Sequence, residues 1–251
     1  MIENKPRIVF LGSNLSPISL ACLKSLAAVD QYELLVGIDH SHLTVWQVFK
    51  LTRQRHGWRG LASRIRKLII VKTGMCLRSA AHFLVGRSLR EVALLKGLQS
   101  FRCAKVNASE TRGLFAAFEP DLVVVANFSQ IIRDEIRRVP KIGIINFHPS
   151  LLPKYRGPSP IFWVIKNGET KSGATVHFID DGINTGDIIM QEELLVLPCD
   201  TEAKLIVRTL AIGAPLLVRA VDTLITGTAQ RIVQVESDAT YFGFPNQRKN
   251  G

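Results

Sequence analysis

Short apolar runs alternate with amphipathic segments along most of the chain, the pattern of a sheet covered by helices. Arg7–Leu11 and Glu33–Ile38 predict strands. Between them, Ser16 and Pro17 predict a helix start, with Ser16 as N-cap and Pro17 at the first helical position. Leu122–Ala126 is fully apolar, as in a strand buried on both faces of a parallel sheet. This order predicts an α/β fold with a doubly wound, mostly parallel sheet.

The second half of the chain predicts more strands and one long helix. We expect strands over Gly143–Ile145 and Ala174–Ile179, and a short helix over Ile161–Lys166. Thr201–Thr226 has its apolar residues on one helical face, which predicts an amphipathic helix against the core. Shorter strands are expected over Ile188–Gln191, Leu194–Leu197 and Arg231–Val235.

The net charge of +11 is concentrated in one segment. His40 to Arg90 contains 11 Lys and Arg residues and no acidic residue, whereas the rest of the chain has 21 of each sign. The 251 residues are enough for one large domain with a sizeable core. We therefore expect one domain over residues 1–245, a basic helical insertion at about 40–98, and a polar tail over 246–251.

Apolar residues such as Trp46 and Ile65 lie among the arginines of this insertion. A basic amphipathic hairpin can contact tRNA phosphates, an anionic membrane surface or a phosphorylated substrate. The alternative is a solvated cover over the sheet edge. If the insertion binds an anionic partner, we expect contacts through some of Arg53, Arg55, Arg59, Arg64, Arg66 and Lys67.

The cysteines are scattered and form no CxxC pair, as expected for reduced thiols in a cytoplasmic protein. No signal peptide and no apolar run of membrane-spanning length is visible. The cysteines are Cys22, Cys76, Cys103 and Cys199.

Three polar side chains follow predicted strands. Gly143–Ile145 ends at Asn146, two residues before His148, and prolines then prevent regular pairing. Ala174–Ile179 leads to Asp181 in a Gly-rich turn. An amide can donate to a developing negative oxygen, an imidazole can exchange a proton, and a carboxylate can orient the imidazole or relay the proton. The set predicts an acyl-transfer site.

These residues belong to two motifs that closely resemble the folate-dependent formyltransferases, the family of the glycinamide ribonucleotide and methionyl-tRNA enzymes. The pattern Asn-x-His-x-Ser-Leu-Leu-Pro-x-aromatic-x-Gly is met by Asn146, His148, Ser150–Pro153, Tyr155 and Gly157. An Asp-x-x-(Asp or Asn)-x-Gly turn begins at Asp181, 33 residues after His148. Weaker resemblance covers residues 7–38 and 120–241, and residues 39–98 do not match.

The resemblance implies a Rossmann-like formyltransferase fold and a catalytic set of Asn146, His148 and Asp181. The cosubstrate would be 10-formyltetrahydrofolate and the acceptor an amine. A zinc site from His148, His177 and Asp181 lacks ligand spacing, so we expect no metal. Asn184 stands where many relatives carry Asp, and we expect it to shape the turn. His177 is expected to be a core histidine.

The implied folate contacts lie in two loops, one after Leu122–Ala126 and the other after Asp181. They are Asn127, Phe128, Ser129, Gln130 and Ile131, with Gly182, Ile183 and Gly186. The turn at Gly12 is not GxGxxG, so a dinucleotide is not expected. Its N–H groups could hold an anionic group of the acceptor, although a plain tight turn fits equally well. The expected acceptor contacts are Ser13, Asn14, Tyr155, Arg156 and Gly157.

The acceptor itself stays open. Methionyl-tRNA formyltransferases carry a basic loop but add a C-terminal β-barrel domain, for which this chain is too short. Glycinamide ribonucleotide enzymes match the length but lack such an insertion. We therefore favour a small amine, anionic or phosphorylated and of the amino-sugar kind. A methionyl-tRNA enzyme without its C-terminal domain and a non-catalytic folate- or RNA-binding module are the alternatives. The oligomeric state is not predicted.

Overall fold

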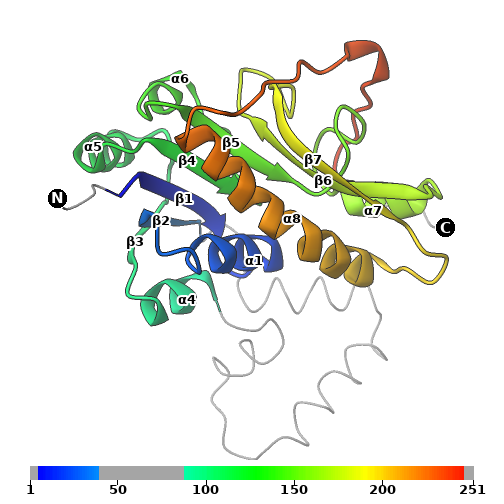
Figure 1. The fold of residues 1–251 in the computed structure, drawn as a ribbon, viewed down its shortest axis with the longest axis horizontal. Coiled ribbons are helices and arrows are strands. Elements are labelled where there is room, and N and C mark those ends of the chain that lie inside the picture. Colours follow the sequence, from blue (N-terminus) through cyan, green and yellow to red (C-terminus); the bar gives the residue numbers. More distant parts are fainter. Residues whose placement is uncertain (1–4, 40–87, 246–251) are drawn as a thin grey trace, which may run out of the picture.

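The computed structural model describes residues 5–39 and 88–245, which form a seven-stranded sheet in the order β3-β2-β1-β4-β5-β6-β7 (Figure 1). The neighbours from β3 to β5 pair in parallel, whereas β6 pairs antiparallel with both β5 and β7. The predicted doubly wound, mostly parallel α/β fold is confirmed. The strands are β1 (Arg7–Ser13), β2 (Glu33–Asp39), β3 (Gln99–Arg102), β4 (Leu122–Ala126), β5 (Gly143–His148), β6 (Lys171–Phe178) and β7 (Ile188–Leu195).

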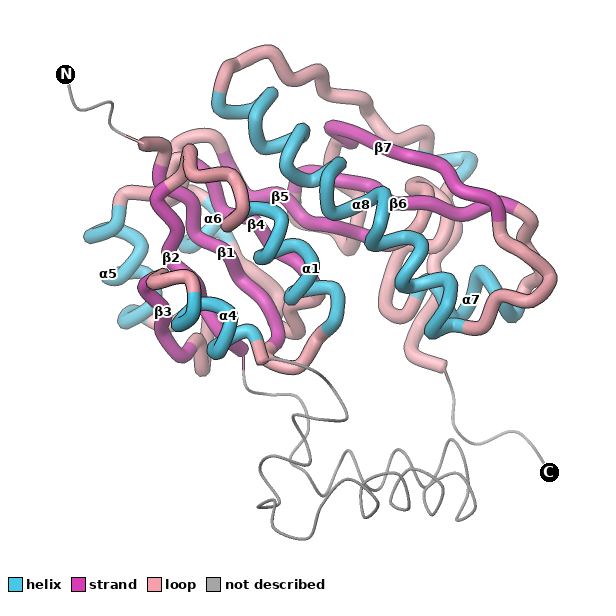
Figure 2. The backbone as a smooth tube through the Cα atoms, turned by 60° about the horizontal axis from the view of Figure 1, so that its bottom comes forward, coloured by secondary structure: helices cyan, strands magenta, loops and turns pink. Residues whose placement is uncertain are grey.

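Helices cover both faces of this sheet. The helices are α1 (Pro17–Leu26), α4 (Leu89–Leu95), α5 (Ser109–Phe118), α6 (Asp134–Arg137), α7 (Pro160–Lys166) and α8 (Glu202–Ile225), followed by a 3₁₀ turn, η1 (Glu236–Asp238). The larger core cluster joins one sheet face to α1, α4 and α8, and the second joins the other face to α5 and α6. Figure 2 shows α8 lying along β6 and β7, next to α1.

The first turn of α1 forms as its sequence predicts. Ser16 has an extended backbone, and its hydroxyl accepts a hydrogen bond from the N–H of Ser19. This contact satisfies one of the free N–H groups at the start of the helix. Ser19 in turn donates to the carbonyl of Ala126, so the cap also joins the helix to the end of β4.

Strand β5 is longer than predicted. We expected it to end at Asn146, but it continues to His148, because Asn146 and His148 pair with His177 and Thr175 of the antiparallel strand β6. The strand then ends before Pro149, which has no N–H for the ladder. The added pairing places both polar side chains on a regular strand, where their spacing of two residues puts them on one face of the sheet.

Two further element predictions need correction, and two short elements were not predicted. The two strands expected between Ile188 and Leu197 are the single strand β7. Arg231–Val235 is not a strand, because within it Ile232 makes only an isolated bridge to Ile188. The short edge strand β3 and the single-turn helix α6 were not predicted, because their four residues carry too little apolar periodicity.

The basic segment largely lies outside the described residues, which exclude 40–87, and so do its predicted helices and arginine contacts. Ser88 begins α4 with a capping box to Glu91, and Leu89, Val92 and Ala93 join the larger core cluster. Within the described ranges, no helix is long and apolar enough to cross a membrane.

Candidate active site

One face of β5 and β6 is polar where its opposite face is apolar. Phe147 and Val176 point into the larger core cluster beneath α8. On the other face, Asn146 lies opposite His177 in the strand register, and His148 lies opposite Thr175. Facing pairs across an antiparallel ladder have side chains within reach of each other. The two histidine rings are 6.3 Å apart between centroids and lie edge to face.

The Asn146 amide contacts His177 directly. Its Nδ2 lies 3.1 Å from His177 Nε2, and its side chain is half-buried. His177 is buried, and its Nδ1 lies 2.7 Å from the carbonyl oxygen of Phe178. A carbonyl only accepts, so Nδ1 carries the proton and Nε2 is the acceptor in the neutral ring. Burial lowers the pKa of His177 to about 4.

His148 is held in a different way. Its Nε2 lies 2.9 Å from the carbonyl oxygen of Tyr155, so Nε2 carries the proton and Nδ1 is the basic nitrogen. The residue is only 4% exposed. Burial and the neighbouring His177 ring lower the pKa of His148 to about 3. The ring is therefore neutral at physiological pH.

Asn184 is the functional candidate that sequence reasoning assigned only to turn structure. Its Nδ2 lies 3.3 Å from His177 Nε2, and its Oδ1 accepts from the N–H of Gly157 at 2.9 Å. The β6–β7 turn brings it there by folding back tightly: a Cβ on Gly186 would lie 2.1 Å from the carbonyl oxygen of Phe178. The signal available in the sequence was the amide itself, at a position where many relatives carry a carboxylate.

Among the described residues, neither histidine is a hydrogen-bond or ion-pair partner of Asp181. Its carboxylate pairs with Arg137 on α6, and its side chain is 93% exposed. Arg137 also pairs with Asp134 within α6. The predicted contact between Asp181 and His148 is not formed in this structure. Asp181 instead ties the β6–β7 turn to the helix that follows the β4 loop.

In the predicted folate loops, several polar side chains serve the fold. Asn127 donates to the hydroxyl of Ser16, Ser129 donates to Asp39, and Gln130 accepts from the N–H of Val106. Phe128 packs against the second core cluster. Gly182 packs against Thr185 within its own turn: a Cβ there would lie 2.1 Å from Thr185 Oγ1, so a larger residue would require Thr185 to move. Each loop also exposes one large hydrophobic side chain, Ile131 on the first and Ile183 on the second.

The Gly12 turn uses two of its N–H groups internally. Ser13 donates to the hydroxyl of Ser19, and Asn14 donates to the carbonyl of Asp39. The Asn14 side-chain oxygen accepts from the N–H of Arg90 at the start of α4. These groups are therefore occupied, and in this structure the turn fits the plain tight-turn alternative better than an anion site.

Tyr155, Arg156 and Gly157 are built into the fold around the site. The Tyr155 hydroxyl donates to Glu169, and the buried Arg156 guanidinium contacts Glu236 and Gln234. Gly157 has a φ of +96°, and a Cβ there would lie 2.2 Å from the carbonyl oxygen of Phe242. We infer that these residues position the loop, since the Tyr155 hydroxyl and the Arg156 guanidinium have partners within the fold.

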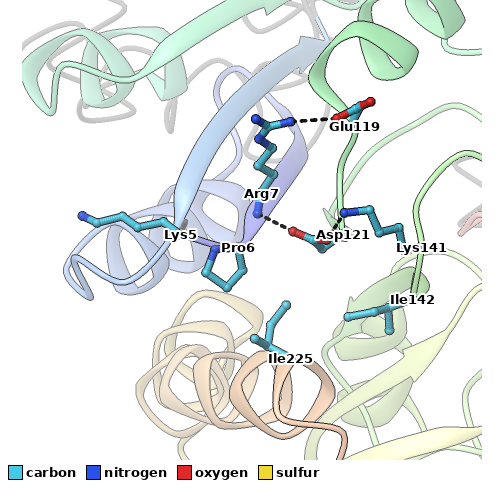
Figure 3. A pocket seen from close by; sticks show the side chains of 8 residues that line it. All are labelled: Lys5, Pro6, Arg7, Glu119, Asp121, Lys141, Ile142 and Ile225. Atoms are coloured by element: carbon cyan, nitrogen blue, oxygen red, sulfur yellow. Dashed lines mark hydrogen bonds and ion pairs between the residues drawn. The ribbon is translucent and has the colours of Figure 1, made fainter. Parts of the chain in front are cut away.

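A separate hollow of about 380 Å³ lies beside the first residue of β1, Arg7, and the two residues before it (Figure 3). Its charged groups satisfy one another, because Asp121 accepts from Lys141 and from the N–H of Arg7, and the Arg7 guanidinium pairs with Glu119. It contains none of the predicted site residues. In the described part of the chain, no three His, Cys, Asp or Glu side chains are grouped as a metal site.

The β5–β6 site presents an amide donor and two buried, neutral imidazoles on one face of the sheet. Such a set can stabilise negative charge on an oxygen and can accept a proton from an attacking nucleophile.

Comparison with known proteins adds the chemistry of relatives. The formyl transferase family model matches residues 51–221, about two thirds of the chain. The match includes residues 51–98, so the resemblance extends into the segment that carried no recognised motif. The methionyl-tRNA formyltransferase of Alkaliphilus metalliredigens is 36% identical over 153 residues, which are 61% of this chain and 49% of that protein. That of Syntrophus aciditrophicus is 45% identical over 122 residues, which are 49% and 39%. This chain thus spans about half the length of these relatives or less.

Solved structures share the fold at low identity. The N-formyltransferase of Helicobacter canadensis, in complex with folinic acid and dTDP-3-aminofucose, aligns with a TM-score of 0.64 and 21% identity, over 95% of this chain and 71% of that one. Glycinamide ribonucleotide transformylase 1 of Symbiobacterium toebii aligns with a TM-score of 0.64 and 20% identity, over 93% and 95%.

Proposed function

The chain belongs to the formyl transferase family, and on this premise we propose that it transfers a formyl group from 10-formyltetrahydrofolate to the nitrogen of an amine acceptor. The observation that carries the proposal is the Asn146 amide, held by His177 beside the neutral ring of His148. The alternative of a non-catalytic binding module would not need an amide and a basic imidazole nitrogen placed together on one strand.

Asn146 and His148 would have different roles in the transfer. Nδ2 of Asn146 has a second hydrogen, which would donate to the formyl oxygen as negative charge builds on it during amine attack. Nδ1 of His148 would accept the proton that the amine loses, because Nε2 is already protonated against Tyr155. The lowered pKa of His148, about 3, makes Nδ1 a weak base, so it would take the proton only once the attacking nitrogen has become cationic, and would then give it to the departing nitrogen or to water.

We infer that the loops after β4 and β6 hold the cosubstrate. Each exposes one aliphatic side chain, Ile131 and Ile183, and the Arg137–Asp181 ion pair joins α6 to the second loop. Exposed aliphatic groups suit a flat heterocycle, and the backbone groups of both loops can supply its polar contacts. When bound, the cosubstrate would supply the activated formyl group.

For the acceptor, we propose a small anionic amine of the amino-sugar kind. Among the structural neighbours, the Helicobacter canadensis enzyme is in complex with dTDP-3-aminofucose. Methionyl-tRNA is the second candidate, because relatives with 35–45% identity over about half of the chain or more are methionyl-tRNA formyltransferases. The basic residues 40–90 would serve either acceptor through phosphate contacts.

The test is a formyl-transfer assay with 10-formyltetrahydrofolate and separate acceptors: a nucleotide-linked amino sugar, glycinamide ribonucleotide, methionyl-tRNA and buffer alone. We expect acceptor-dependent release of tetrahydrofolate, measured by folate absorbance, with the amino sugar. Transfer only to methionyl-tRNA would favour the second candidate. Cosubstrate binding without turnover on any acceptor would favour the non-catalytic alternative.

The substitution Asp181→Asn tests whether Asp181 is catalytic, as the sequence motif implies, or serves mainly as the ion-pair partner of Arg137, as in the structure. The catalytic hypothesis for Asp181 expects at least about a hundredfold loss of rate. In the structure this carboxylate is exposed and pairs with Arg137, so we expect less than about tenfold loss of kcat, with any effect on the KM for the folate. Steady-state kinetics decide, and a hundredfold fall in kcat would restore Asp181 to the catalytic set.

A further inference from the structure

We propose that His177 and Asn184 are positioning residues that fix the orientation of the Asn146 amide, with its NH2 group and not its oxygen turned towards His177. The proposal rests on the proposed function, in which Asn146 donates to the formyl oxygen. From the sequence, His177 is expected to be a core histidine and Asn184 to shape the turn; the proposal gives each a role at the site.

Two backbone groups determine the donors and acceptors in this cluster. The carbonyl of Phe178 only accepts, so His177 Nδ1, at 2.7 Å, must carry the proton. The N–H of Gly157 only donates, so the Asn184 atom that faces it at 2.9 Å must be the oxygen. Asn184 therefore turns its Nδ2 towards His177 Nε2.

The contact of His177 with the Phe178 carbonyl and the contact of Asn184 with the Gly157 N–H independently make His177 Nε2 an acceptor. Asn146 faces the same nitrogen at 3.1 Å, so the atom it presents must also be its donor, Nδ2. Turning a side-chain amide by half a rotation exchanges its oxygen and its nitrogen, so the correct orientation is the one that matches its hydrogen-bond partners. Here the reversed amide would place an oxygen against the lone pair of His177, which is repulsive.

The lone pair of His177 Nε2 is shared between two amides. Asn184 lies at 3.3 Å and Asn146 at 3.1 Å, so the two donors compete for a single acceptor. Asn146 uses one hydrogen of Nδ2 for His177, and the second hydrogen is left for a ligand. The link through Asn184 also couples the cluster to Gly157, and so to the loop whose carbonyl at Tyr155 holds His148.

The first test needs no activity. Nitrogen-15 NMR of the full chain with labelled histidine should show His177 at neutral pH with a protonated Nδ1 and an unprotonated Nε2. His148 should show the opposite tautomer, which makes it an internal reference. A protonated Nε2 on His177 would overturn the proposal whatever the enzyme assay shows.

The second test uses kinetics with matched variants. His177→Phe keeps a flat ring but removes the acceptor, and we expect kcat to fall about tenfold to a hundredfold with the KM for the folate unchanged. His177→Gln can place an oxygen against Asn146 and an NH2 against the Phe178 carbonyl, so it should recover most of the lost kcat. Thermal unfolding of both variants controls for a purely structural loss.

The outcomes are separable. Equal kcat losses in His177→Phe and His177→Gln, in proportion to their loss of stability, would mean that His177 is structural only and would refute the positioning role. Normal kcat in His177→Phe would refute it as well. If the unmodified protein transfers formyl to no acceptor, the proposed function fails, and the NMR result still decides the orientation of the amide.

Discussion

Replacing Asn146 by Ala is expected to lower kcat at least about a hundredfold, because in the proposed mechanism it removes the side-chain N–H that donates to the formyl oxygen; Asn146 Nδ2 lies on the β5–β6 face, 3.1 Å from His177 Nε2. Loss of a comparable donor in an oxyanion site costs roughly 3 to 4 kcal/mol of transition-state stabilisation. The amide is half-buried, and water cannot fully replace it on a sheet face flanked by two buried histidines.

Asn146→Asp sharpens the same prediction. It keeps the shape of the side chain but replaces the donor by a negative charge, which would oppose charge on the formyl oxygen. We expect a loss at least as large as in Asn146→Ala. Asn167→Ala is the matched control, since it removes an exposed asparagine amide whose side chain donates to the Tyr155 hydroxyl.

Steady-state kinetics with thermal unfolding of each variant would check this result. Turnover within about threefold of the unmodified protein in both Asn146 variants would remove Asn146 from the catalytic set.

His148→Ala is expected to lower kcat by a similar factor, because in the proposed mechanism it removes the nitrogen that accepts the amine proton.

The second large effect is a loss of stability in acid, caused by the two buried histidines. Burial lowers the folded-state pKa of His148 to about 3 and that of His177 to about 4, whereas the unfolded chain has ordinary values near 6.5. Asp180, which raises the pKa of His177, and Arg156, which lowers it, are the charged groups that act on that ring.

The direction of the pH effect on stability follows from proton binding. Between pH about 6.5 and about 4, these histidines are protonated in the unfolded state but stay neutral in the folded state, so the free energy of unfolding falls as the pH falls. The stability is complete above about pH 6.5 and is lost progressively below it. For His177 alone the loss amounts to about 3 kcal/mol by pH 4, from a pKa difference of roughly 2.5 units at 1.36 kcal/mol each.

Urea unfolding at a series of pH values would measure the effect. His148→Gln and His177→Gln should each reduce the slope of stability against pH in this window, because glutamine does not titrate. A slope unchanged in the double variant would show that other groups cause the acid sensitivity.

The sequence by itself determined the elements whose signal is local. Strand β4 is found at its predicted bounds, because five consecutive apolar residues in a buried strand need no information from elsewhere. The start of α1 at Pro17 follows from the adjacent cap residue Ser16. The motif around Asn146 and His148 indicated the family in the same way, since its residues are close together in the chain.

Tertiary structure decided which polar groups meet. The antiparallel register of β6 extends β5 to His148 and sets His177 opposite Asn146, a contact between residues 31 positions apart. The fold of the β6–β7 turn then brings Asn184 to His177 and leaves Asp181 with Arg137. Periodicity within one segment cannot specify a register between strands or the direction in which a turn folds back, because both depend on packing between distant parts of the chain.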